Sequence, residues 1–125
     1  NHILNLNVPI LGICYGHQIL AKRFGGKIKL SKTREFGHAV VKSKSKSSIT
    51  KNFFKKNNTL VWMSHQDIVD TLPSGFKKIA SSNNSEFAVI ANEKKNITEY
   101  SFILKSAILK MVKFYLKIFY LIFVK

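Results

Sequence analysis

The G-x-C-x-G pattern at residues 12–16, with Cys14 at its centre, constrains the fold of this chain more than any other feature. It follows an apolar run, residues 8–13, that is typical of a buried strand in a parallel sheet. Residues 17–24 predict a short helix, and the glycine pair 25–26 ends it as a C-cap. A cysteine between two glycines, at the junction of a strand and a helix, is the arrangement of a nucleophile elbow.

The predicted elbow would assist a reaction at Cys14 in two ways. The backbone N–H of Tyr15 could hold an oxyanion, and the N-terminus of the helix should lower the pKa of a thiol placed there. The alternative is that Cys14 is a small apolar residue buried in the core, as single cysteines usually are. The five-residue pattern alone leaves both interpretations open.

Five further runs are apolar or alternate between apolar and polar residues, and they predict strands separated by polar turns. They are residues 27–30, 38–42, 59–63, 76–81 and 87–91. Strands combined with a helix predict an α/β fold. The tract 42–56 is rich in lysine and serine and predicts a solvated loop and helix edge, with a basic binding patch as the alternative.

Length and charge narrow the functions that this chain can have. With 125 residues it holds one domain at most. A net charge of +15 would suit nucleic acid or an anionic membrane. However, 19 of the 21 basic residues are lysine, spread along the whole chain, whereas phosphate and base recognition favours arginine. We therefore expect no nucleic-acid partner.

Cysteine and histidine usage argues against a metal site. A single cysteine excludes an internal disulfide and a cysteine-based zinc site, and it fits a reducing compartment. The histidines show no metal-ligand spacing. The first residues do not form a basic and then apolar secretory leader. We expect a cytoplasmic protein without a bound metal.

The composition changes near the end of the chain. Of residues 101–125, 18 are apolar and five are lysine, with no acid, glycine or proline. Lys110, Lys113 and Lys117 would share one face of a helix, so a basic amphipathic helix on a membrane surface is conceivable. The longest unbroken apolar stretch, residues 118–124, is too short for the ~20 residues that span a bilayer. We expect a membrane partner to be the minority case.

Four stretches of the sequence resemble the class I glutamine amidotransferase family, in its GMP-synthetase branch. They read V-P-I-L-G-I-C-Y-G-H-Q at residues 8–18, G-G at 25–26, R-E-F-G at 34–37 and V-W-M-S-H-Q-D at 61–67. Residues 72–76, 79–81 and 87–92 continue the resemblance to about residue 97. The R-E-F-G and W-M-S-H stretches favour the GMP-synthetase branch over the anthranilate, carbamoyl-phosphate and CTP branches. We therefore divide the chain into a partial amidotransferase domain, residues 1–97, and a tail, residues 98–125.

The resemblance implies a flavodoxin-like, doubly wound α/β sheet in which Cys14 attacks the side-chain amide of glutamine. The ammonia released would aminate XMP to GMP in a synthetase domain that uses ATP and Mg²⁺, so no cofactor is expected in this part. Gln18 matches a glutamine-binding position, and Ser64 and His65 match a substrate-binding loop. From the residues alone, Gln18 could equally face solvent on the helix.

The histidines of the chain match no catalytic base of the family. His65 corresponds to a position that lines the glutamine site. His2, His17 and His38 occupy no catalytic position, so we expect surface or core-edge imidazoles there.

The chain departs from the family where the catalytic histidine and glutamate would lie. The family has Y-G-V-Q-F-H-P-E there, and this chain reads T-E-Y-S-F-I-L-K at residues 98–105. The front half of the family's domain and its synthetase domain also have no counterpart. We therefore expect a sheet incomplete at both ends and an inactive remnant. The alternatives are an enzyme completed by a second subunit and a non-catalytic protein whose basic apolar tail binds membranes.

A shifted reading frame would explain this departure. Codons for residues 97–105 can be chosen so that one T restored after codon 97 gives I-Y-G-V-Q-F-H-P-E. At two later positions the restored sequence hardly depends on which synonymous codons are chosen. In the restored frame, residues 110–112 must read Asn or Asp followed by Gly, and residues 117–120 must read Asn or Asp, then Phe, Leu or Ile, then Leu. Both resemble the closing helix of the family, so the sequence predicts that the tail is out-of-frame translation.

Overall fold

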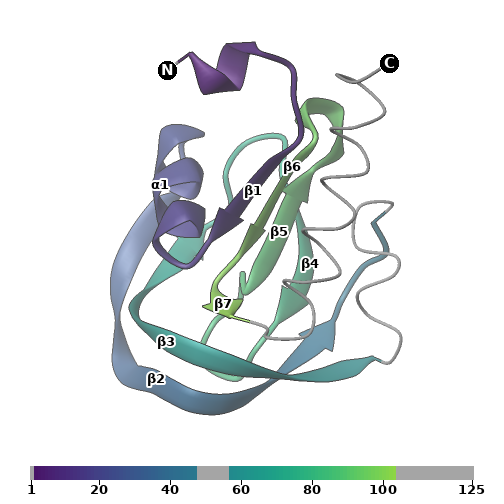
Figure 1. Cartoon of the computed structure of the whole chain (residues 1–125). Helices are drawn as coiled ribbons and strands as arrows, with labels where there is room; N and C mark the ends of the chain where they lie inside the picture. Colours follow the sequence, from purple (N-terminus) through teal and green to yellow (C-terminus); the bar gives the residue numbers. More distant parts are fainter. Residues whose placement is uncertain (1, 48–56, 104–125) are drawn as a thin grey trace.

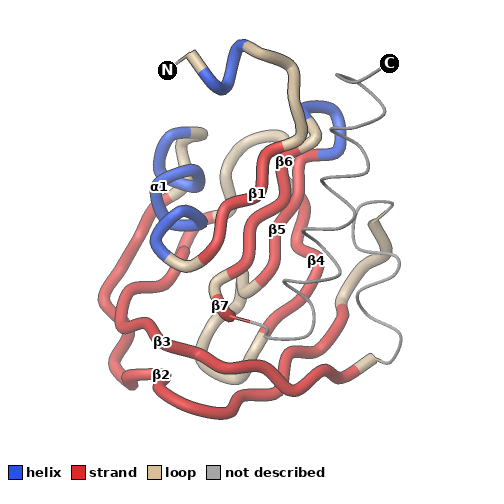
Figure 2. Tube along the Cα trace, in the orientation of Figure 1, coloured by secondary structure: helices blue, strands red, loops and turns tan. Residues whose placement is uncertain are grey.

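The computed structural model describes residues 2–47 and 57–103 of the chain. The elements are η1 Ile3–Asn5, β1 Ile10–Ile13, α1 Tyr15–Arg23, β2 Lys27–Ser43, β3 Asn58–Thr71, β4 Lys77–Ser81, β5 Val89–Asn92, η2 Glu93–Lys95, β6 Ile97–Tyr100 and β7 Phe102–Ile103. The strands form one mixed sheet in the order β1-β6-β5-β4-β2-β3-β7 (Figure 1). The helix α1 packs beside β1 (Figure 2).

The predicted strand, turn and helix are present. Strand β1 ends at Ile13, Cys14 makes the turn, and α1 begins at Tyr15. The glycine pair caps the helix as expected. The N–H of Gly26 donates to the carbonyl of Ala21 at 2.8 Å, and Gly25 has a φ of 88°, in the left-handed region that glycine adopts without strain.

Strands β2 and β3 form a long antiparallel ribbon that the sequence did not predict at this length. The predicted strands 27–30 and 38–42 belong to one strand, and the predicted strand 59–63 continues to Thr71. The ribbon curls around α1 and below the shorter strands (Figure 1). A change in register between Leu30 and Glu35 marks a bulge in β2, which allows this bend.

The sheet is less parallel than a doubly wound fold requires. Among the described residues, only β1 and β6 pair in parallel, and α1 is the only α-helix. The chain therefore has a partial α/β fold with a curled, largely antiparallel sheet. The expectation of a doubly wound sheet with helices is met only in part, because the described residues have one parallel strand pair and one α-helix.

The core lies on both faces of the sheet. Side chains alternate along β5, so Ile90 faces α1 while Val89 and Ala91 face away. The α1 side buries Ala21, Val69, Phe76, Ile90 and Ile97. The other side buries Val41, Val61, Met63, Ile79, Ala80, Ala88, Val89, Ala91, Tyr100 and Phe102.

The sheet also contains a strand in the segment where the sequence departs from the family pattern. Strand β6, residues Ile97–Tyr100, lies between β1 and β5 and is buried throughout. Its backbone pairs with both neighbours although its sequence departs from the family pattern. Residues 48–56 of the lysine-rich tract and residues 104–125 of the tail lie outside the described residues. Within the described part, no helix is long and apolar enough to cross a membrane.

Candidate functional site

Cys14 occupies a strained turn at the carboxyl end of β1. Its φ of 53° and ψ of −110° lie outside the regions that non-glycine residues prefer. Two backbone hydrogen bonds hold this conformation: the N–H of Cys14 donates to the carbonyl of Tyr100 at 2.8 Å, and its carbonyl accepts from the N–H of Gln18 at 3.3 Å. Strain of ~1–3 kcal/mol at one residue is typical of functional sites.

Gly12 allows the helix to approach the strand at this turn. A Cβ added to Gly12 would lie 2.8 Å from Cδ1 of Leu20 and 3.1 Å from the backbone of Gly16. A Cβ added to Gly16 would meet no atom within 4 Å beyond the adjoining residues and the backbone of α1. The first glycine of the pattern is therefore required by close packing, whereas the second has room for a side chain.

The thiol of Cys14 lies in a partly apolar environment. The residue is half-buried and forms no disulfide, and burial raises the pKa of its thiol above the ordinary value. This corrects the expectation that the helix N-terminus would lower it, because desolvation penalises the thiolate. Tyr15 is the first residue of α1 and its side chain is 72% exposed. Its N–H is one of those without an acceptor inside the helix.

Gln18 connects the elbow to β3. Its side-chain Nε2 donates to the backbone carbonyl of Asp67 at 2.9 Å, so the side chain does not simply face solvent. Ser64 and His65 precede Asp67 on the same strand, and their side chains alternate, with Ser64 exposed and His65 buried. The sequence predicted both in a loop. The structure places them inside β3 and brings this stretch beside α1.

The imidazole of His65 contacts two groups, one from β2 and one from β3. Its Nε2 lies 3.5 Å from Oε2 of Glu35 and 3.2 Å from Sδ of Met63. Burial lowers the pKa of His65; the carboxylates of Glu35 and Asp67 oppose this, and the imidazole of His17 reinforces it. His65 is therefore neutral at pH 7.

A second buried pair lies beside the elbow, and sequence reasoning missed it. Nδ1 of His17 is 3.1 Å from Oε2 of Glu99, and the side chains are 2% and 0% exposed. This corrects the expectation that His17 would be a surface or core-edge imidazole. Burial lowers the pKa of His17 to about 4 and raises that of Glu99 to about 8. The sequence predicted His17 in a helix and Glu99 in the tail, and no motif or periodicity indicated that these two residues would be in contact.

The remaining histidines lie apart from this region. The ring of His38 packs edge-on against Trp62 on the β2–β3 ribbon, with centroids 5.1 Å apart, and His2 is exposed. In the described part of the chain, no group of three or more His, Cys, Asp or Glu side chains could hold a metal ion.

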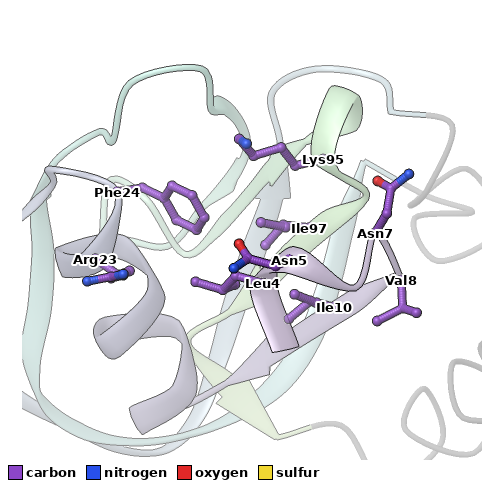
Figure 3. A pocket seen from close by; sticks show the side chains of 9 residues that line it. All are labelled: Leu4, Asn5, Asn7, Val8, Ile10, Arg23, Phe24, Lys95 and Ile97. Carbon is purple, nitrogen blue, oxygen red and sulfur yellow. The ribbon is translucent and has the colours of Figure 1, made fainter. Parts of the chain in front are cut away.

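A hollow of about 280 Å³ lies at the opposite end of β1 from Cys14. Figure 3 shows its wall, which is formed by Leu4, Asn5, Asn7, Val8, Ile10, Arg23, Phe24, Lys95 and Ile97. Because it opens near Ile10, at the start of the strand, it is separate from the elbow.

Comparison with known proteins finds similarity along most of the chain. The family described as glutamine amidotransferase class-I matches residues 1–100. A GMP synthase (glutamine-hydrolysing) of Campylobacter hominis is 43% identical over 102 residues, which are 82% of this chain and 20% of that protein. The corresponding protein of Thermosipho melanesiensis is 47% identical over 96 residues, which are 77% of this chain and 18% of that one. The chain spans about one fifth of the length of these relatives.

Solved structures agree with the sequence comparison. A Thermoplasma acidophilum protein described as a candidate GMP synthase subunit superposes with a TM-score of 0.74 at 31% identity, over 81% of this chain and 50% of that one. A glutamine amidotransferase from Thermotoga maritima gives 0.74 at 27% identity, over 82% of this chain and 43% of that one. The described fold thus corresponds to about half of each solved chain.

Proposed function

The chain belongs to the class-I glutamine amidotransferase family, and we propose that it forms the glutamine-binding part of a GMP synthase whose hydrolytic step is lost. The observation that carries this proposal is the geometry of Cys14. A cysteine held at a positive φ between β1 and α1, with Gln18 hydrogen-bonded to the strand of Ser64 and His65, is a nucleophile beside a polar binding strand.

The proposed ancestral reaction is transfer of the γ-acyl group of glutamine to the thiol of Cys14. The sulfur forms a thioester as the carbon–nitrogen bond breaks, and the leaving nitrogen takes a proton to become ammonia. Water then hydrolyses the thioester to glutamate and regenerates the thiol. The N–H of Tyr15 would stabilise the oxyanion of each tetrahedral intermediate. In a full GMP synthase the ammonia would aminate XMP.

We propose that catalysis is negligible in this chain because the proton carriers are missing. The family supplies them in its H-P-E segment, and this chain has Ile103, Leu104 and Lys105 there. Loss of one member of a cooperating triad typically costs orders of magnitude in rate. ATP and Mg²⁺ would serve the synthetase part of such an enzyme, since amide hydrolysis by a thiol requires neither.

A frameshift after codon 97 is our explanation for the missing segment, and two buried groups support it. The hydroxyl Oγ1 of Thr98 and Oε1 of Glu99 are buried without a hydrogen-bond partner among the described residues. Buried polar groups are normally paired, so unpaired ones mark side chains that do not suit their position. Glu99 lies opposite Gly12 in β1, and the codon choice that gives the family segment puts glycine at position 99. Translation of the gene with one base restored after codon 97 decides this point: a stop codon before the closing helix, or absence of the H-P-E segment, would refute it.

Protection of Cys14 from alkylation tests the proposed binding function. We expect glutamine to slow the reaction of Cys14 with iodoacetamide, because bound substrate covers the thiol. The variants Ser64→Ala and His65→Ala should weaken this protection. Glutamate at equal concentration serves as the control ligand. Equal alkylation rates with and without glutamine would contradict the proposal.

A further inference from the structure

The carboxylate of Glu35 is placed against His65 by the pairing of two strands. Glu35 on β2 is the register partner of His65 on β3, at the point where pairing resumes after the bulge. Both side chains are buried, and the Glu35 Oε2 to His65 Nε2 distance is 3.5 Å. The bulge therefore brings a charged group into the interior at one defined position.

Two serines hold this carboxylate in place. The hydroxyl of Ser82 donates to Glu35, with its Oγ 3.3 Å from Oε1 and 3.4 Å from Oε2. The backbone N–H of Ser85 donates in turn to the hydroxyl oxygen of Ser82 at 3.1 Å. The turn between β4 and β5 thus holds the Glu35 side chain of β2 in one position through hydrogen bonds, in addition to its contact with His65.

The surroundings of His65 decide which of its ring nitrogens carries the proton. Both groups close to Nε2 can only accept: the carboxylate of Glu35 and the thioether of Met63. The neutral imidazole must therefore carry its hydrogen on Nε2. Nδ1 is then a hydrogen-bond acceptor, and it is buried without a partner among the described residues.

We propose that Glu35 is a positioning residue for glutamine binding: it fixes His65 as the Nε2–H tautomer, so that Nδ1 accepts a hydrogen bond from an N–H group of the ligand. This rests on the proposed function, since it names glutamine as the ligand. A buried acceptor without a partner gains the full value of a hydrogen bond when a donor arrives. The opposite tautomer would present a second donor there and repel the ligand's N–H.

The tautomer can be measured without any ligand. Nitrogen-15 NMR distinguishes the protonated from the unprotonated ring nitrogen, and His65→Gln identifies the signals. We expect Nε2–H in the wild-type chain at neutral pH. Glu35→Gln should give a mixture of tautomers, because an amide can donate as well as accept, and Glu35→Asp should retain Nε2–H. The control Glu93→Gln, at the far end of β5, should leave the spectrum unchanged.

Glutamine protection of Cys14 against iodoacetamide then tests the consequence for binding. Glu35→Gln should weaken protection by about tenfold, the value of one hydrogen bond, and Glu35→Asp should restore most of it. A wild-type Nδ1–H tautomer, or a Glu35→Gln spectrum identical to wild type, overturns the assignment of Glu35. If glutamine fails to protect the wild-type chain while the Nε2–H tautomer is present and depends on Glu35, the proposed function fails and the positioning of His65 stands.

Discussion

Nδ1 of His17 lies 3.1 Å from Oε2 of Glu99, in a part of the core where neither side chain reaches solvent. Glu99 lies on β6 as the register partner of Gly12 on β1, in the strand next to the elbow. Beside this contact, the backbone of Phe87 interacts with His17, whereas Oε1 of Glu99 is buried without a partner among the described residues.

This pair should make the stability of the chain fall between pH 6.5 and about 8. Burial raises the pKa of Glu99 from 4.5 to about 8 and lowers that of His17 from 6.5 to about 4. Between pH 4.5 and 6.5 the folded and unfolded pairs each hold one proton, so the pair contributes no slope. Above pH 6.5 only the folded pair still holds it, and the free energy of unfolding decreases by about 2 kcal/mol before levelling near pH 8.

Glu99→Gln isolates this effect, since the amide has nearly the same shape and does not titrate. Urea unfolding at intervals from pH 6 to 9 measures the free energy of unfolding of both proteins. The value for Glu99→Gln should rise relative to that of the wild type as the pH increases, up to about pH 8. Glu86→Gln, which removes an exposed carboxylate that pairs with Lys78, serves as the control and should not reproduce the trend. Parallel pH profiles for Glu99→Gln and wild type would show that the pair does not hold its proton as described.

Gly12→Ala should destabilise the elbow while Gly16→Ala does not create a clash. The added methyl group at position 12 would meet Leu20 at 2.8 Å and the backbone of Gly16 at 3.1 Å, and overpacking of this kind costs ~1–3 kcal/mol. At position 16, apart from the adjoining residues and the backbone of α1 itself, no atom lies within 4 Å of the new methyl group. Thermal or urea unfolding of both variants measures the difference. A smaller loss for Gly12→Ala than for Gly16→Ala would contradict the described packing.

Cys14 should react slowly with iodoacetamide at neutral pH. Burial raises the pKa of its thiol above 9.0, so the thiolate that carries the reaction is scarce at pH 7. We expect the midpoint of the rate against pH to lie above 9.0 in the folded chain and to fall in urea, where the thiol is solvated. A folded-state midpoint below that in urea would indicate that the helix N-terminus outweighs desolvation.

The local features of the fold could be predicted from the sequence because they depend on neighbouring residues. The apolar run before Cys14 and the glycines after α1 specify the strand, the turn and the helix end. The β2–β3 ribbon could not be predicted at its full length, since polar residues such as Lys32 and Arg34 interrupt the apolar pattern of an exposed, bulged strand. Pairing with β3 at Lys27–Leu30 and again at Glu35–Lys42, on both sides of the bulge, joins these residues into one strand.

Residues of the candidate site could be predicted from the sequence only where they belong to a motif of the family. Cys14, Gln18, Ser64 and His65 follow from the family pattern, and their roles in binding remain predictions. The contacts of Glu35 with His65 and of His17 with Glu99 depend on strand register, which brings together residues 30 and 82 positions apart. No periodicity in the sequence encodes such contacts.

Release of ammonia from glutamine, compared between the wild-type chain and Cys14→Ala, tests the central claim most directly. The account predicts that glutamine slows the alkylation of Cys14, but that ammonia release by the wild-type chain does not exceed that of Cys14→Ala. The reason is that Ile103, Leu104 and Lys105 stand where the family has the H-P-E segment that protonates the leaving nitrogen. Ammonia release that depends on Cys14 at ~1 s⁻¹ or faster, the lower end of ordinary enzymatic rates, would contradict it.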